Sequence, residues 1–356
     1  MSQPGIKKFV LRTLVALLPV FGLIAIYVCM DPFGVVHYYD GISIQPGDTI
    51  EQMPNKRYVA LEGFKYYNPQ RHYDSFIFGS SISSNFTAEA WKRHLPDSAS
   101  VYHFTEGAQT LSGIRNELRY LLDHGVEVRH VLLVMEEEMF HRSERYEEMP
   151  FVPHPDVSPR ISWLHFHRVH FNALRDPDLL RFKLWPTREI TDKLLADAKI
   201  STVPSGRDEM LNEDSSIGLD TLILNHPADY YADMQWLADM QPNPGPMPLS
   251  IDPKAEALLK EIAAMLREAH AEYQVIVPPR FRSQGLSAVD HALLCETMGQ
   301  NHVNDFSWDP ELIGDLHSYY DGVHILTYRC TQLIDRAYQS VTQAFPAYAR
   351  DLTHKY

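Results

Sequence analysis

Residues 74–82 read DSFIFGSSI, a short apolar run that ends in a glycine and two serines. The run from Asp74 to Gly79 is continuous rather than alternating, which predicts a strand buried on both faces of a parallel sheet. At the carboxyl end of such a strand, the backbone amides of the following turn point outward and bind ligands or stabilise anions. We therefore expect Ser80 and Ser81 at the functional edge of the sheet. An ordinary strand-to-helix turn with a serine cap is the structural alternative.

Strand and helix patterns alternate on both sides of this segment. Alternation of this kind predicts a parallel sheet with helices on both faces, a three-layer α/β/α sandwich. The expected strands are residues 98–104, 129–135, 274–277 and 302–306, and the expected helices are residues 87–94, 110–124, 252–273, 287–298 and 327–344.

The alternation stops between residues 140 and 250, a segment rich in Pro, His, Asp and Trp. We interpret this segment as a mostly helical insertion or cap, with helices near residues 188–198 and 228–240. The expected organisation is a tip and membrane anchor over 1–30, a lead-in over 31–71, the first part of the sheet domain over 72–139, the insertion over 140–250, and the second part of the sheet domain over 251–356.

The amino terminus carries Lys7, Lys8 and Arg12, followed by an uncharged run from Thr13 to Met30. The run is long enough to cross a hydrocarbon core, and acidic residues follow it. This asymmetry predicts an uncleaved signal anchor of the bacterial inner membrane, with the rest of the chain periplasmic or extracellular. A cleaved signal peptide would need small residues near its end, a lipoprotein would need a small residue before Cys29, and a buried core helix would lack the basic flank.

Composition excludes several classes of protein. The 356 residues include 46 acidic and 32 basic side chains, a net charge of −14, which argues against binding of DNA or RNA. With 45 % apolar residues the chain is not intrinsically disordered. Cys29, Cys295 and Cys330 form no CxxC pair, which excludes zinc ribbons and thioredoxin-like sites. We expect no cofactor.

A second motif, DGVH over residues 321–324, stands just before the closing helix. This spacing lets a turn bring the Asp321 carboxylate onto the Nδ1–H of His324, which leaves Nε2 free to accept a proton from a serine. His317, two residues after Asp315, is a rival base.

Together these motifs resemble the SGNH, or GDSL-like, hydrolase superfamily. Gly79–Ile82 matches the first sequence block of that superfamily, which makes Ser81 the nucleophile, and Asp321 and His324 match the last block. The resemblance therefore implies a catalytic triad of Ser81, His324 and Asp321.

The resemblance also implies an oxyanion hole formed by the backbone amides of Ser81 and Gly107, because Gly107 matches the second block. The third block normally offers an Asn, whereas residues 135–139 read MEEEM. Loss of one oxyanion donor can cost about 10²–10³ in rate, so this departure bears on activity.

An anchored chain with Gly-Ser-Ser, no third-block Asn and a large insertion is similar to the membrane-anchored proteins related to DltD of teichoic-acid D-alanylation and to the alginate O-acetylation proteins. That similarity implies a serine O-acyl esterase or acyltransferase that acts on a cell-envelope polymer or glycan, with a membrane-bound O-acyltransferase as a partner. The alternatives are simple hydrolysis of a lipid or carbohydrate ester, and a non-catalytic envelope-assembly or glycan-binding protein that retains the fold.

Four further side chains are candidates for substrate binding: Ser80, Glu137 within the run of three glutamates, Arg280 after a strand, and Tyr320 beside the DGVH motif. The alternative for Glu137 is a solvated loop, that for Arg280 is compensation of the glutamate charges, and that for Tyr320 is packing in the core. The histidines at positions 165, 167 and 170 have no acidic or cysteine partner at ligand spacing, so we expect no metal site there.

Overall fold

The structure, a computed structural model, describes residues 3–37, 55–141, 149, 151–177, 180–181, 207–232, 234–241 and 251–344. Its centre is a parallel five-stranded sheet. The strands are β1 (Ser75–Gly79), β2 (Val101–Thr105), β3 (His130–Val134), β6 (Glu272–Val277) and β7 (Val303–Asp305). The expected α/β class and parallel sheet are confirmed.

The strand order is β2-β1-β3-β6-β7, so the chain moves outward from β1 in both directions. Gly79, the last residue of β1, is in register with Thr105 of β2 and with Val134 of β3. The chain therefore leaves three adjacent strands at the same level. In open α/β sheets, ligands bind at such a point, where the strand order reverses beside the first strand.

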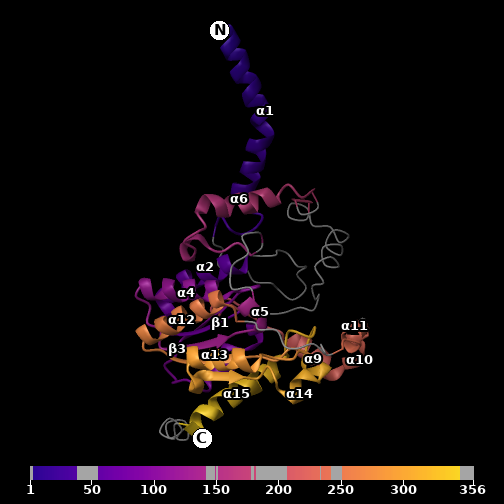
Figure 1. The fold of residues 1–356 in the computed structure, drawn as a ribbon. Coiled ribbons are helices and arrows are strands. Elements are labelled where there is room, and N and C mark those ends of the chain that lie inside the picture. The colour runs from indigo at the N-terminus through magenta and orange to yellow at the C-terminus, as the bar shows by residue number, and fades with distance from the viewer. Residues whose placement is uncertain are drawn as a thin grey trace.

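Helices cover both faces of the sheet (Figure 1). Alternate residues of β1 show this division, because Phe76 and Phe78 belong to one core cluster and Ile77 belongs to the other. The first face is covered by α2 (Lys56–Arg71), α4 (Leu111–Asp123), α12 (Pro253–Glu268) and α13 (Ala288–Met298), and the second by α3 (Ala88–Lys92) and α15 (Thr327–Ala344).

Local signals set the helix ends within a few residues of the prediction. The helix expected over 252–273 ends at Glu268, because His270 has a φ of +54° and the Ala271 N–H turns back to the Leu266 carbonyl. The released residues begin β6 at Glu272 instead of 274. Short helices complete the domain: η3 (Gln300–His302), α14 (Pro310–Ile313) and η4 (Leu316–Ser318).

In the expected insertion, the described helices are α5 (Glu137–His141), η2 (Pro155–Val157), α6 (Trp163–Ala173), α9 (Ile217–Asn225), α10 (Pro227–Tyr231) and α11 (Gln235–Ala238). The single helix expected over 228–240 is therefore wrong, since two short helices stand there. The helix expected near 188–198 lies outside the described residues. A hairpin of β4 (Arg207–Asp208) and β5 (Glu213–Asp214) packs beside β2, where the His103 N–H donates to the Leu211 carbonyl at 3.1 Å. The domain boundaries remain a prediction.

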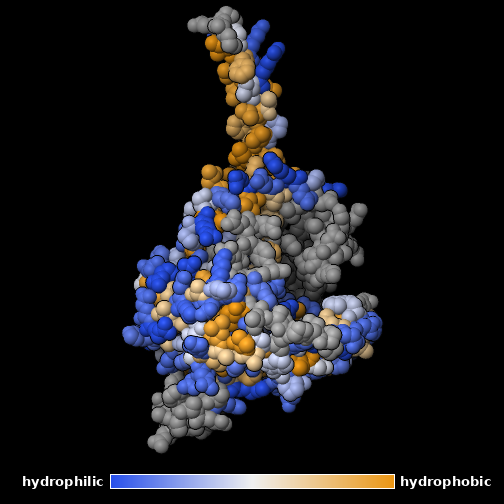
Figure 2. All heavy atoms as spheres, in the orientation of Figure 1, coloured by the Kyte–Doolittle hydropathy of each residue, from blue (hydrophilic) through white to orange (hydrophobic). Residues whose placement is uncertain are grey.

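The amino-terminal helix α1 (Gln3–Met30) projects away from the sheet domain (Figure 1). Its segment Gly5–Met30 is long and apolar enough to span a membrane, and few of the side chains in this segment are buried. Figure 2 shows it as an apolar rod above a largely hydrophilic body. This helix is consistent with the expected single-pass anchor.

Candidate active site

The structure brings Ser81, His324 and Asp321 together. Ser81 opens the short helix η1 (Ser81–Asn85), directly after β1. His324 Nε2 lies 2.9 Å from Ser81 Oγ, and His324 Nδ1 lies 2.8 Å from Asp321 Oδ2. Because a carboxylate only accepts hydrogen bonds, Nδ1 carries the ring proton, and the neutral ring accepts the hydroxyl proton of Ser81 at Nε2. The side chains of His324 and Asp321 are 31 % and 47 % exposed, so the pair is open to solvent.

A tight loop presents Asp321 and His324. Its base is an antiparallel bridge between Tyr319 and Ile325. Within it, Asp321 Oδ1 accepts hydrogen bonds from the backbone N–H groups of Val323 and His324, at 3.0 and 2.9 Å. Gly322 has a φ of +86°, a conformation that favours glycine. The three-residue separation of Asp321 and His324 is therefore that of a turn in which the side chain of the first residue accepts hydrogen bonds from the backbone of the third and fourth.

The electrostatics of the pair favour an ionised carboxylate. Burial alone would raise the pKa of Asp321, but the hydrogen bond and charge of His324 and the two backbone N–H groups outweigh it and lower that pKa. Asp321 is thus ionised at neutral pH and able to stabilise an imidazolium on His324.

The turn that carries Ser81 is tied to the loop that carries His324. Asn85, at the end of η1, donates from Nδ2 to the Ile325 carbonyl at 2.8 Å. Ser84 Oγ donates to the Ser81 carbonyl at 2.7 Å. Residues separated by more than 200 positions are thereby held in register at the reacting atoms. The role of Asn85 has no signal in the sequence.

Gly107 lies where the sequence places it, two residues after β2, as Ser81 lies two residues after β1. The turn is held by Arg57, which donates to the Ala108 carbonyl at 2.7 Å and pairs with Glu106 at 3.4 Å. Both charged side chains are buried. Ala108 has a φ of +49°, so the turn around Gly107 is bent into an uncommon conformation that these contacts hold.

Glu136 occupies the matching place after β3, where the resemblance leads one to expect Asn. It is buried, and the Ser80 hydroxyl donates to its carboxylate. Burial raises the pKa of Glu136, against the lowering effects of that hydrogen bond and of Arg280. Ser80 is also buried, so its hydroxyl holds Glu136 and caps η1 below the surface.

Glu137, the glutamate chosen from the sequence, lies in the first turn of α5, with its carboxylate 3.8 Å from His141 Nε2. Ser81, Gly107 and Glu136 each lie two residues after the end of their strand, β1, β2 and β3 respectively. This shared spacing distinguishes Glu136 from Glu137 and Glu138.

A second Ser-His-acid arrangement lies beneath the first. Ser83 Oγ is 3.0 Å from His103 Nε2, and His103 Nδ1 is 3.0 Å from Glu213 Oε1. All three residues are buried, and Ser83 Oγ also donates to the Ser80 carbonyl at 2.7 Å. No substrate can reach this serine, so the network supports the nucleophile turn and ties it to the β4–β5 hairpin.

The remaining predicted residues take no part in the hydrogen bonds that join Ser81, His324 and Asp321. Tyr320 is buried, and its hydroxyl donates to the carboxylate of Asp220 in α9. The ring of His317, the rival base, lies against Tyr231, with ring centroids 5.5 Å apart. Arg280 bears on the site through its charge, which favours the ionised form of Glu136.

The histidine-rich segment forms α6. His167 Nδ1 is hydrogen-bonded to the Tyr27 hydroxyl at 2.9 Å, and His170 Nδ1 to the Phe166 carbonyl. Burial lowers the pKa of His170 to about 4. The helix uses these rings for packing against α1 and the domain.

Glu62, His154 and Asp156 offer ligand atoms close together. However, the Lys65 ammonium lies 2.7 Å from both carboxylates and fills the place of a cation. The Asp156 N–H donates to His154 Nδ1, so His154 Nε2 carries the proton that it gives to Glu62 at 3.0 Å. We therefore interpret the group as an ion-pair network.

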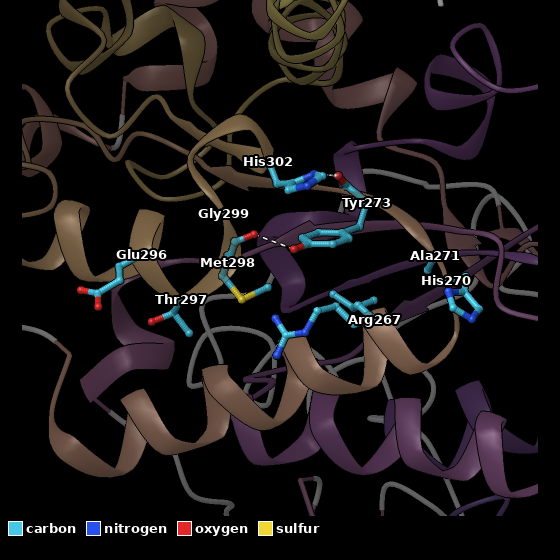
Figure 3. A pocket seen from close by; sticks show the side chains of 10 residues that line it. Arg267, His270, Ala271, Tyr273, Glu296, Thr297, Met298, Gly299 and His302 are labelled. Carbon is cyan, nitrogen blue, oxygen red and sulfur yellow. Dashed lines mark hydrogen bonds between the residues drawn. The ribbon is translucent and has the colours of Figure 1, made fainter. Parts of the chain in front are cut away.

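A pocket of about 660 Å³ lies away from Ser81, and Figure 3 shows the side chains that line it. It is lined by Arg267, His270, Tyr273 and His302, around the amino end of β6. Ser81 follows the carboxyl end of β1, which runs parallel to β6 through β3. The pocket thus lies at the opposite end of the sheet. The His302 ring stacks on Tyr273 there, with centroids 4.2 Å apart.

No family model matches the chain, and no curated protein matches it either.

Proposed function

We propose that the chain is a membrane-anchored, extracytoplasmic serine O-acyl esterase or acyltransferase of the SGNH type, acting on a cell-envelope polymer or glycan. The observation that carries the proposal is the continuous chain of hydrogen bonds from Ser81 Oγ through His324 to Asp321, at 2.9 and 2.8 Å. Its position at the carboxyl end of β1 and its exposure to solvent support the same conclusion.

In the proposed mechanism, Ser81 Oγ attacks an ester carbonyl while His324 Nε2 takes the hydroxyl proton. The Asp321 carboxylate stabilises the resulting imidazolium. The tetrahedral intermediate collapses as His324 returns the proton to the leaving alcohol, which leaves the acyl group on Ser81. Water or a polymer hydroxyl then attacks the acyl-enzyme, with His324 again acting as the base.

In this proposal the oxyanion is held by the amides of Ser81 and Gly107. Glu136 stands in place of the third-block Asn, and burial raises its pKa. The partial loss of donors predicts a slow enzyme on simple esters. A membrane-bound O-acyltransferase that supplies the acyl group is part of the proposal, because an anchor formed by α1 would hold this chain in the membrane where such a partner acts.

The test uses the full chain in lipid nanodiscs, with an aryl acetate and a fluorophosphonate probe. We expect labelling and turnover in the wild type, loss of both in Ser81→Ala, and retained labelling in Ser98→Ala, a control at an exposed serine before β2, at the other end of the sheet. Labelling that persists in Ser81→Ala contradicts the triad.

If the wild type neither labels nor turns over, the non-catalytic alternative is the better account, and binding of acylated glycans becomes the measurement. Transfer of the acetyl group to an added polysaccharide, detected by mass spectrometry, distinguishes a transferase from a hydrolase.

A further inference from the structure

We propose that α6 is an interfacial helix that lies on the bilayer spanned by α1, with its outward face in contact with lipid headgroups and the upper acyl chains. The proposal is independent of catalysis. It assigns a second membrane contact to the chain, made by a segment 130 residues beyond the anchor.

The length of the apolar run in α1 sets the depth of α6 in the bilayer. The uncharged run Thr13–Met30 contains 18 residues, which span about 27 Å as a helix at about 1.5 Å per residue. A hydrocarbon core is about 30 Å thick, so Lys7, Lys8 and Arg12 lie at one interface and the last turn of α1 lies at the other.

The last turn of α1 is where α6 packs. The Tyr27 hydroxyl is hydrogen-bonded to His167 at 2.9 Å, and the Tyr27 ring meets Phe171 edge-on, with centroids 5.8 Å apart. Figure 1 shows α6 lying across this end of α1. The depth of Tyr27 thus places α6 at the boundary between hydrocarbon and headgroups.

The connection between α1 and α6 is rigid, whereas a helix on a flexible tether would not be held at a fixed depth. Immediately after α1, the Asp31 carboxylate accepts hydrogen bonds from the N–H groups of Val35, Val36 and His37, at 2.8–3.0 Å. Phe33 and Val35 are buried in one apolar cluster with Tyr27 and with residues of α2 and α6. The angle between α1 and α6 is therefore fixed by packing.

The outward face of α6 carries side chains that suit a membrane interface. Phe166 and His170 turn inward and are buried, whereas Trp163 is 42 % exposed and Leu164 is 80 % exposed. Arg168 is exposed four residues after Leu164, hence on the same side of the helix, and Arg175 is exposed two residues beyond the end of α6.

Trp and Leu beside arginines are the composition of an interfacial helix, since the rings and aliphatic groups enter the acyl boundary while guanidinium groups bind phosphate. Hydrophilic surface at the base of α1 is visible over α6 in Figure 2. A basic face in a chain of net charge −14 also distinguishes this surface from the rest.

The test places an environment-sensitive fluorophore at one position at a time in the full chain, in nanodiscs that contain anionic lipid. The positions are Leu18→Cys in the span, Leu164→Cys on α6, and Val289→Cys on α13 as the aqueous control, where the native side chain is 63 % exposed. Cys29→Ser and Cys295→Ser provide the background, and the buried Cys330 is retained.

Quenching by a spin label on the upper acyl chain separates insertion from mere proximity. We expect the label at 164 to be quenched at least three-fold more than that at 289, with blue-shifted emission. Equal quenching and equal emission at 164 and 289 overturn the proposal. Charge reversal through Arg168→Glu and Arg175→Glu should lower the quenching at 164 at least two-fold in anionic lipid, and no change would refute the role given to the arginines. Because no substrate is present, these results stand apart from those of the esterase test.

Discussion

The sharpest prediction concerns Asp321→Asn, because it alters one proton while leaving the loop in place. Asn offers the same Oδ1 to the backbone N–H groups of Val323 and His324. Its Nδ2, however, is a donor that faces His324 Nδ1, so the ring proton moves to Nε2. His324 then presents an N–H to Ser81 and cannot accept the hydroxyl proton.

The expected loss in kcat is about 10³–10⁴-fold, which at about 1.36 kcal/mol per factor of ten is a rise of about 4–5.4 kcal/mol in the activation barrier. The effect on stability should be small, since Asp321 is 47 % exposed and a solvent-exposed ion pair contributes about 0–1 kcal/mol. Aryl acetate hydrolysis gives kcat and KM, and thermal unfolding gives stability.

Retention of more than a tenth of wild-type kcat in Asp321→Asn would refute this account of the tautomer. His317→Gln is the matched control, because the ring of His317 lies against Tyr231. This substitution should leave kcat within about three-fold of the wild-type value. If His317→Gln abolishes turnover and His324→Gln does not, the assignment of the base is wrong.

Three further predictions concern the support of the site. Burial raises the pKa of Glu136 in the folded state above that of an ordinary carboxyl group. As the pH rises between these two pKa values, the unfolded chain loses its proton first, so the free energy of unfolding falls. Glu136→Gln should therefore have the wild-type melting temperature at pH 4 and a higher one at pH 8; equal values at both pH values would contradict the buried charge. Arg57→Met removes one partner of a buried ion pair with Glu106 and should lower the free energy of unfolding by about 3–5 kcal/mol, measured by denaturant titration. Asn85→Leu removes the hydrogen bond to Ile325 and should cost about 1–3 kcal/mol in stability. It should also lower kcat at least ten-fold with little change in KM, and an unchanged kcat would show that this tie does not align the reacting atoms.

Local pattern sufficed for the sheet and for the apolar helix. The predicted bounds of β1, β2 and β3 lie within a few residues of the observed ones, since burial on both faces favours apolar side chains along most of each strand. Exceptions such as Ser75, His103 and His130 are buried and hydrogen-bonded. Short helices were harder to predict. The segment over residues 228–240 reads as one periodic helix, yet it folds as α10 and α11.

Within the candidate site, the sequence distinguished the residues of the proposed triad but not those that hold them. Ser81 and the DGVH motif have local signatures, a strand end and a three-residue turn. Glu136 could not be separated from Glu137 and Glu138 until the register of β1 with β3 showed which one follows its strand by two residues.

The sequence by itself determined the parallel sheet, the apolar span and the order of the reactive side chains, because each depends on the hydrophobicity and turn chemistry of neighbouring residues. The tertiary structure alone decided which residues support them. Ser83, His103 and Glu213 form a buried hydrogen-bond network although 130 positions of sequence separate the first from the last. Tyr27 is hydrogen-bonded to His167, which lies 140 positions later in the sequence. Such contacts leave no periodic trace in the chain, since they depend on how whole elements pack against one another.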